Sequence, residues 1–135
     1  LYIPKAVYEE VAISGKDEPG SVETKEAMEN GWIKIKQMQD SLAVQVLTKS
    51  VDVGEAEAII LAKEMQADIV FLDDSQARSV AEFMGLNIVG VVGMLMLAVA
   101  KGLPVVLKES IDQLIKEGFR ISPKLYKQIL EDFKE

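Results

Sequence analysis

The stretch from Asp52 to Asp74 constrains the fold of this chain more than any other. Asp52 and Glu55 have the three-residue spacing of a capping box, and apolar residues continue at helical spacing to about residue 66. The continuous apolar run 69–72 follows and ends at Asp73 and Asp74, which is the pattern of a strand buried on both faces of a parallel sheet. A helix followed at once by such a strand predicts an α/β fold.

The rest of the chain continues this alternation of helices and strands. Residues 32–36 alternate between apolar and polar, as in a half-buried strand near a sheet edge, and the run 88–92 predicts a further apolar strand. Ser75 is placed to cap the helix that follows the two acids. Helical spacing, caps and glycine stops predict other helices at about 4–12, 22–30, 76–84, 93–101, 108–117 and 123–133. Residues 41–49 fit either a helix or a strand, and we expect a helix. We therefore expect one α/β domain with a mostly parallel sheet, for which 135 residues suffice.

The composition excludes several classes of catalyst. The chain has neither cysteine nor histidine, which rules out serine–histidine triads, cysteine proteases and zinc–thiolate sites. Carboxylates remain, and the metals that suit them are Mg²⁺ or Mn²⁺. The net charge of −7 provides no basic stripe, so a nucleic-acid partner would need metal ions or local lysines. No run reaches the roughly 18 to 20 apolar residues of a membrane span, and no signal peptide is recognisable, so we expect a cytoplasmic protein with no membrane partner.

Four acids are the candidates for chemistry: Glu55 and Glu57 at a helix start, and Asp73 and Asp74 at a strand end. Ligands of open α/β sheets gather beyond the carboxyl ends of the strands, where the two aspartates are expected. Structural roles also explain these acids, because Asp74 can cap the next helix, Glu55 suits the positive end of its own helix, and Glu57 is expected to be solvated. Clustered carboxylates raise one another's pKa unless a cation is present. A divalent ion would resolve that conflict and suits metal-assisted phosphoryl hydrolysis.

Other candidates have equally plain alternatives. Arg78, one turn after Asp74, could touch a phosphate or form an i,i+4 ion pair. Lys34 and Lys36 could meet a nucleic-acid backbone, or they could form a solvated face that protects a sheet edge. The methionine- and valine-rich segment 91–100 is a candidate homodimer surface.

Four runs of the sequence resemble those of PIN-like domains, and the closest resemblance is to a subgroup of unknown function. The runs are 3–11 (IPKAVYEEV), 54–62 (GEAEAIILA), 71–78 (FLDDSQAR) and 85–93 (GLNIVGVVG). The resemblance implies a three-layer α/β/α, Rossmann-like fold and a single PIN-like domain over 1–135. It also implies a ribonuclease that depends on Mg²⁺ or Mn²⁺, with RNA as substrate. Some members are toxins of VapC-type toxin–antitoxin pairs, so an antitoxin is a possible protein partner.

The same resemblance assigns site residues one position at a time. Glu10 matches a glutamate on an early helix, and Glu9 is the alternative. Glu55 matches the acid that opens the helix before a core strand. Asp74 matches the acid that ends that strand, and Asp73 is its neighbour. The family's first acid, an aspartate on an N-terminal strand, has no counterpart in this sequence. Truncation at the N-terminus is therefore one expectation, and a catalytically inactive PIN-like module for protein interaction or nucleic-acid binding is the alternative function. A phosphate- or nucleotide-binding α/β domain is a third hypothesis on fold grounds only, and no glycine-rich phosphate loop supports it.

Overall fold

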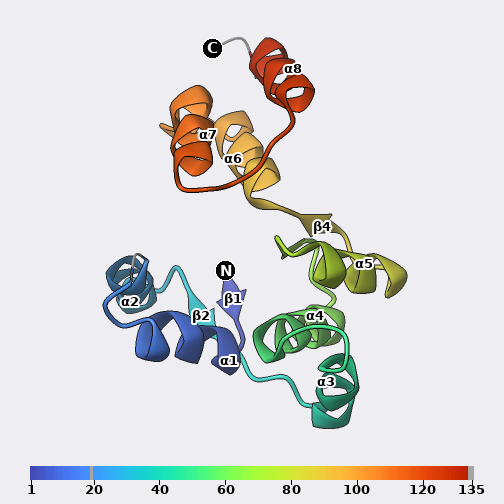
Figure 1. Ribbon diagram of the computed structural model, residues 1–135. Coiled ribbons are helices and arrows are strands. Elements are labelled where there is room, and N and C mark those ends of the chain that lie inside the picture. Colours follow the sequence, from blue (N-terminus) through green and yellow to red (C-terminus); the bar gives the residue numbers. More distant parts are fainter. Residues whose placement is uncertain (19, 134–135) are drawn as a thin grey trace. The chain divides into compact units, whose positions relative to one another are not determined.

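The computed structural model describes residues 1–18 and 20–133 and divides into two compact units, Leu1–Ile88 and Val89–Glu135 (Figure 1). The first unit alternates short strands with helices, and the second is helical. The expected α/β class is confirmed. The elements of the first unit are β1 (Tyr2–Ile3), α1 (Lys5–Tyr8), η1 (Glu9–Ser14), α2 (Ser21–Glu29), β2 (Lys34–Ile35), α3 (Ser41–Leu47), α4 (Val53–Met65), β3 (Val70–Phe71) and α5 (Ser75–Phe83), and the boundary between the units falls within β4 (Ile88–Val89).

The first helix changes its winding partway along. Pro4 precedes α1, as expected for a residue without an N–H group, and the chain then continues as the π-helix η1. Gly15 ends η1, and its N–H donates to the carbonyl of Glu10 over 2.9 Å. A Cβ at Gly15 would lie 2.8 Å from that same carbonyl oxygen, so only glycine fits there. π-Helical turns are rare and often occur at functional sites, and this one carries Glu9 and Glu10.

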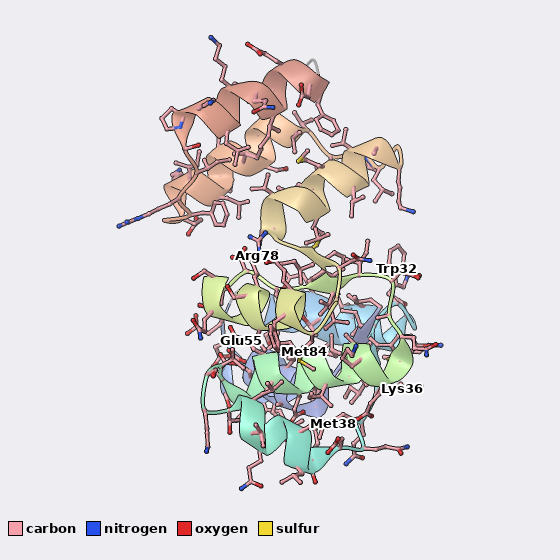
Figure 2. All side chains as sticks on the ribbon, turned by 90° about the vertical axis from the view of Figure 1, so that its right-hand side faces the viewer. Trp32, Lys36, Met38, Glu55, Arg78 and Met84 are labelled. Atoms are coloured by element: carbon pink, nitrogen blue, oxygen red, sulfur yellow. The ribbon has the colours of Figure 1, made fainter. Side chains whose placement is uncertain are left out.

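The strands form two small sheets, β1–β2 and β3–β4, in the part of the chain that the structure describes. β1 and β2 are parallel, with Tyr2 opposite Lys34 and Ile3 opposite Ile35. The expected half-buried strand at 32–36 is shorter and more exposed than predicted: β2 is exposed at both of its residues, and Trp32 is 76% exposed. Figure 2 labels Trp32 and Lys36.

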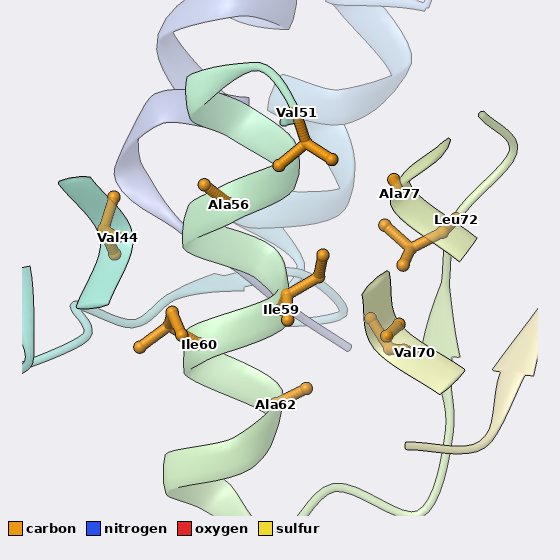
Figure 3. Packing of buried hydrophobic residues seen from close by; sticks show 10 residues of the cluster. Val44, Val51, Ala56, Ile59, Ile60, Ala62, Val70, Leu72 and Ala77 are labelled. Atoms are coloured by element: carbon orange, nitrogen blue, oxygen red, sulfur yellow. The ribbon is translucent and has the colours of Figure 1, made fainter. Parts of the chain in front are cut away.

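The core of the first unit forms around α4 (Figure 3). The predicted capping box is present, with Glu55 N–H donating to Asp52 Oδ1 over 2.8 Å and Asp52 N–H donating to Glu55 Oε2 over 3.2 Å. Ile60 points toward Val44 of α3, whereas Ile59 points toward the β3 side of the helix. Ile59 is fully buried, so α4 is the central support of this unit.

Two details of the later strands differ from expectation. β3 is buried on one face only, since Val70 and Leu72 are buried while Ile69 and Phe71 are 40% and 39% exposed. The apolar run alone could not reveal that the side chains of Ile69 and Phe71 stay exposed. The predicted strand at 88–92 is limited to β4, because Val91 already belongs to the next helix.

The second unit consists of α6 (Val91–Ala100), α7 (Leu107–Lys116) and α8 (Pro123–Phe133). Its core contains Leu107, Ile111 and Ile129. The α8 start was predicted correctly, since Ser122 Oγ accepts a hydrogen bond from Leu125 N–H over 3.1 Å. Among the described residues, no helix has the length and apolar content required to cross a bilayer.

Candidate functional site

Two of the predicted site acids act electrostatically on a third at the N-terminus of α4. Glu55 lies in the first turn of that helix, Glu10 comes from η1, and Asp74 comes from the end of the β3 segment. Burial raises the pKa of the Glu55 carboxyl, the hydrogen bond from the Asp52 backbone lowers it, and the negative charges of Asp52, Asp74 and Glu10 raise it further. The net shift is upward. The acids that the sequence places 64 positions apart, Glu10 and Asp74, thus share one electrostatic neighbourhood.

Gly54 allows the Glu10 carboxylate to come this close to α4. A Cβ at Gly54 would lie 3.1 Å from Glu10 Oε2, which is tighter than most Cβ contacts, and at an ordinary contact distance of 3.5 Å from Val7 Cγ2. Gly54 is buried in the first turn of α4, where the free N–H groups and the helix dipole favour a negative charge. Glu10 is therefore held against the positive end of a 13-residue helix.

The acids also have the structural roles that the sequence allowed. Asp74, rather than the expected Ser75, is the N-cap of α5, and its Oδ2 accepts from Ala77 N–H over 3.0 Å. Ser75 is instead the first residue inside the helix. Since Glu55 is engaged in the capping box, both acids already accept backbone hydrogen bonds.

Glu57 was expected to be solvated, and that prediction is wrong. Its Oε1 accepts a hydrogen bond from Ala6 N–H over 3.1 Å, across 51 positions of sequence. Glu57 thus satisfies a free N–H in the first turn of α1 and ties α1 to α4. No local pattern signals such a contact, because it depends on how the two helices pack.

The remaining candidates lie in different surroundings. Glu9, the alternative to Glu10, forms an exposed pair with Lys5, with 3.8 Å between Lys5 Nζ and Glu9 Oε1. Asp73 is an exposed neighbour of Asp74. Arg78 is exposed on α5, and within the described ranges it forms no ion pair with Asp74 (Figure 2). The i,i+4 pair that the sequence allowed is therefore absent. Lys34 is exposed on β2.

The donor chemistry of Glu10, Glu55 and Asp74 fits a hard divalent cation, which prefers carboxylate oxygens. Burial is the main cause of the raised Glu55 pKa, and a bound cation would neutralise the smaller contribution from the charges of Asp52, Asp74 and Glu10. Within residues 1–18 and 20–133, however, no three acids are grouped as a ready-made ligand set. The caps at Glu55 and Asp74 would have to share their oxygens with an ion.

Comparison with known proteins gives one family. A family model described as a PIN domain, DUF3368, matches residues 1–135. Neither the search of curated proteins nor the search of solved structures yields a match.

Proposed function

Because the chain belongs to the PIN domain family, whose members point to nuclease-type function, we propose that it is a divalent-metal-dependent endoribonuclease. The match covers residues 1–135, which supports treating both compact units as parts of one PIN domain. The observation that supports the proposal is that Glu10 lies against the first turn of α4 and that its charge and that of Asp74 add to burial and to Asp52 in raising the pKa of Glu55.

In this proposal, Glu10, Glu55 and Asp74 hold Mg²⁺ or Mn²⁺ through carboxylate oxygens, and Asp73 is the neighbouring donor. The bound ion would supply an activated water and stabilise the charge that develops on a phosphodiester. Gly54 keeps Glu10 close to the α4 N-terminus, and the capping box orients Glu55. Arg78, which forms no ion pair with Asp74 among the described residues, is available to meet an RNA phosphate.

The test of the metal site is thermal unfolding with and without MnCl₂. Asp74→Asn is the informative variant, because asparagine caps a helix about as well as aspartate but removes the charge. Asp40→Asn is the matched control: Asp40 caps α3 in the same way, accepting from Ala43 N–H over 3.0 Å, and it does not contribute to the Glu55 shift. Mn²⁺ at about 100 times its dissociation constant should stabilise the wild type and Asp40→Asn by about 2.7 kcal/mol. Asp74→Asn should lose that stabilisation.

Activity is tested by incubating the protein with a mixed pool of unstructured RNA, Mn²⁺ or EDTA. Cleavage that requires Mn²⁺ and is lost in Asp74→Asn is the expected result. Equal melting temperatures with and without Mn²⁺, together with an uncleaved pool, would overturn the proposal.

One observation favours a second candidate, a PIN-like module that acts through protein contacts. All ten residues of α6 are apolar or glycine, yet none of them is fully buried, and Met94 and Leu97 are 41% and 36% exposed. Such a surface suits a second copy of this chain or an antitoxin-like protein. Sedimentation of the wild type and of Leu97→Lys tests it, since a dimer through α6 should dissociate in the variant. If the wild type sediments as a monomer, the homodimer is rejected.

A further inference from the structure

The β1–β2 ladder carries an unusual surface, which we define as Tyr2, Trp32, Lys34 and Lys36. Tyr2 lies opposite Lys34 in the parallel register, and register partners project to the same face of a sheet. Lys36 reaches the same tyrosine, because its Nζ lies 5.7 Å from the centre of the Tyr2 ring. Trp32 precedes β2 by two positions, and all four side chains are exposed.

This surface combines flat aromatic rings with positive charge. Trp32 is 76% and Tyr2 48% exposed, although burying a large aromatic side chain normally stabilises a fold. The segment 31–39 contains two lysines and no acid, whereas the whole chain has a net charge of −7. The local charge is thus opposite to that of the molecule, which favours an anionic partner at this place.

The backbone that presents Trp32 and the lysines is well anchored. Trp32 N–H donates to the Ala27 carbonyl over 2.8 Å, and Lys36 N–H donates to the Ile3 carbonyl over 3.0 Å. The backbone that carries these side chains is therefore ordered in the absence of a partner, which reduces the entropy lost on binding.

A hollow of about 420 Å³ extends from Lys36, a size typical of small-ligand sites. Its lining also includes Gln37, Gln39, Leu61, Glu64 and Met65. The Glu64 carboxylate already accepts hydrogen bonds from the N–H groups of Gln39 and Asp40, at 2.7 and 3.0 Å. Because a glutamine amide has both donors and acceptors, the side chains of Gln37 and Gln39 can hydrogen-bond a polar, flat ligand beside Lys36.

We infer that the Tyr2–Trp32–Lys34–Lys36 surface recruits single-stranded RNA. Exposed aromatic rings stack on unpaired bases, and flanking lysines follow the phosphates; together these are the two components of sequence-tolerant single-strand binding. A protein partner would be better served by a continuous apolar patch than by two lysines beside the rings. The inference rests on the proposed function in its choice of RNA, but it assigns binding to side chains other than the acids at α4.

The experiment measures binding of a single-stranded oligouridylate of about eight nucleotides, a length within the usual site size. EDTA is present throughout, so binding is observed without metal or cleavage. Trp32 is the only tryptophan, and quenching of its fluorescence reports directly on stacking. Anisotropy of a labelled oligonucleotide gives the affinity of variants that lack Trp32.

Trp32→Ala should weaken binding by about fivefold to a hundredfold, and Trp32→Phe should restore part of it because a ring remains. Lys34→Ala and Lys36→Ala should each lower the slope of log K against log[salt] by about 0.7. Phe83→Ala is the matched control, since Phe83 is a 93% exposed aromatic on α5 outside this surface, and it should bind as the wild type does. Circular dichroism verifies that each variant is folded.

The inference is overturned if RNA leaves Trp32 fluorescence unchanged, or if folded Trp32→Ala binds the oligonucleotide as tightly as the wild type. It is also overturned if the substitution alters only self-association, because the surface is then a protein contact. Asp74→Asn separates this inference from the proposed function: the variant should bind normally in EDTA and fail to cleave. If RNA binds at this surface but is never cleaved in a metal-dependent way, the proposed nuclease function is wrong and the binding surface stands. If RNA is cleaved but does not bind at this surface, only the binding surface is wrong.

Discussion

Glu55→Gln is the substitution that best separates the structural role of the acidic site from its proposed chemistry. Glutamine serves a capping box as glutamate does, so its side-chain oxygen can still accept from Asp52 N–H. The substitution removes the charge that Asp52, Asp74 and Glu10 oppose. We therefore expect the variant to be slightly more stable than the wild type at neutral pH, while it loses stabilisation by Mn²⁺.

The expected gain is small because Glu55 is only half-buried, and the solvent that still reaches it screens its like-charge contacts. We expect about 0.5 kcal/mol, the magnitude of weak surface charge pairs. With an unfolding entropy of about 2.1 cal/mol/K per residue, this corresponds to a rise in Tm of about 2 °C for a chain of 135 residues. Glu55→Ala is the control: it gives the same charge relief but loses a hydrogen bond worth about 1 kcal/mol, so it should melt below Glu55→Gln.

The pH dependence gives a further check. The pKa of Glu55 is raised in the folded state, so folding takes up a proton, and the contribution of Glu55 to stability is full below its usual value of 4.5 and falls as the pH rises through the raised value. The advantage of Glu55→Gln should therefore appear above that raised pKa and vanish at pH 4. A lower Tm than the wild type at pH 7, or an advantage that persists at pH 4, would refute the reasoning.

Three further predictions address other parts of the molecule. Gly54→Ala should leave the Tm unchanged or raise it slightly, because alanine favours a helix by about 1 kcal/mol over glycine. The new Cβ would lie 3.1 Å from Glu10 Oε2, and the exposed Glu10 carboxylate can move away from it. That movement should lower the affinity for Mn²⁺, measured by titration calorimetry, by about tenfold or more. Ile59→Ala should destabilise the protein by about 2–5 kcal/mol in urea unfolding, because Ile59 is fully buried, and a loss below 1 kcal/mol would contradict the assigned core. Tyr126→Phe removes the 2.6 Å hydrogen bond to Asp112 Oδ1, so the lowered pKa of Asp112 should rise toward its ordinary value in an NMR titration.

The sequence was most informative where structure is determined locally. The Asp52–Glu55 spacing predicted both hydrogen bonds of the capping box, and the acids after the apolar run predicted the position of Asp74. These features depend on neighbours three or four positions away, which a sequence displays directly. Helix positions followed for the same reason, and the helix at 41–49, the least clear of them, is present as α3.

Features that depend on packing between distant segments could not be predicted. Glu57 can accept the hydrogen bond from Ala6 N–H only because α1 and α4 pack side by side. The π-helix that carries Glu10 has no distinctive periodicity in the sequence. Alternation in 32–36 indicated a half-buried strand, but it could not reveal that Trp32 lies 76% exposed. Burial depends on which element covers a face, and a strand pattern contains no information about its cover.

Capping accounts for the positions of Glu55 and Asp74, but it does not require that either side chain be charged. Capping needs an acceptor oxygen and not a full charge, so glutamine in place of Glu55 and asparagine in place of Asp74 would satisfy the same N–H groups. The raised pKa of Glu55 comes first from burial, and the negative charges of Asp52, Asp74 and Glu10 add to it. The like-charge contacts of Glu55 are unfavourable, and the positive end of the helix dipole offsets part of that cost. The divalent cation that we propose would offset the remaining cost, because it carries the opposite charge and prefers carboxylate oxygens.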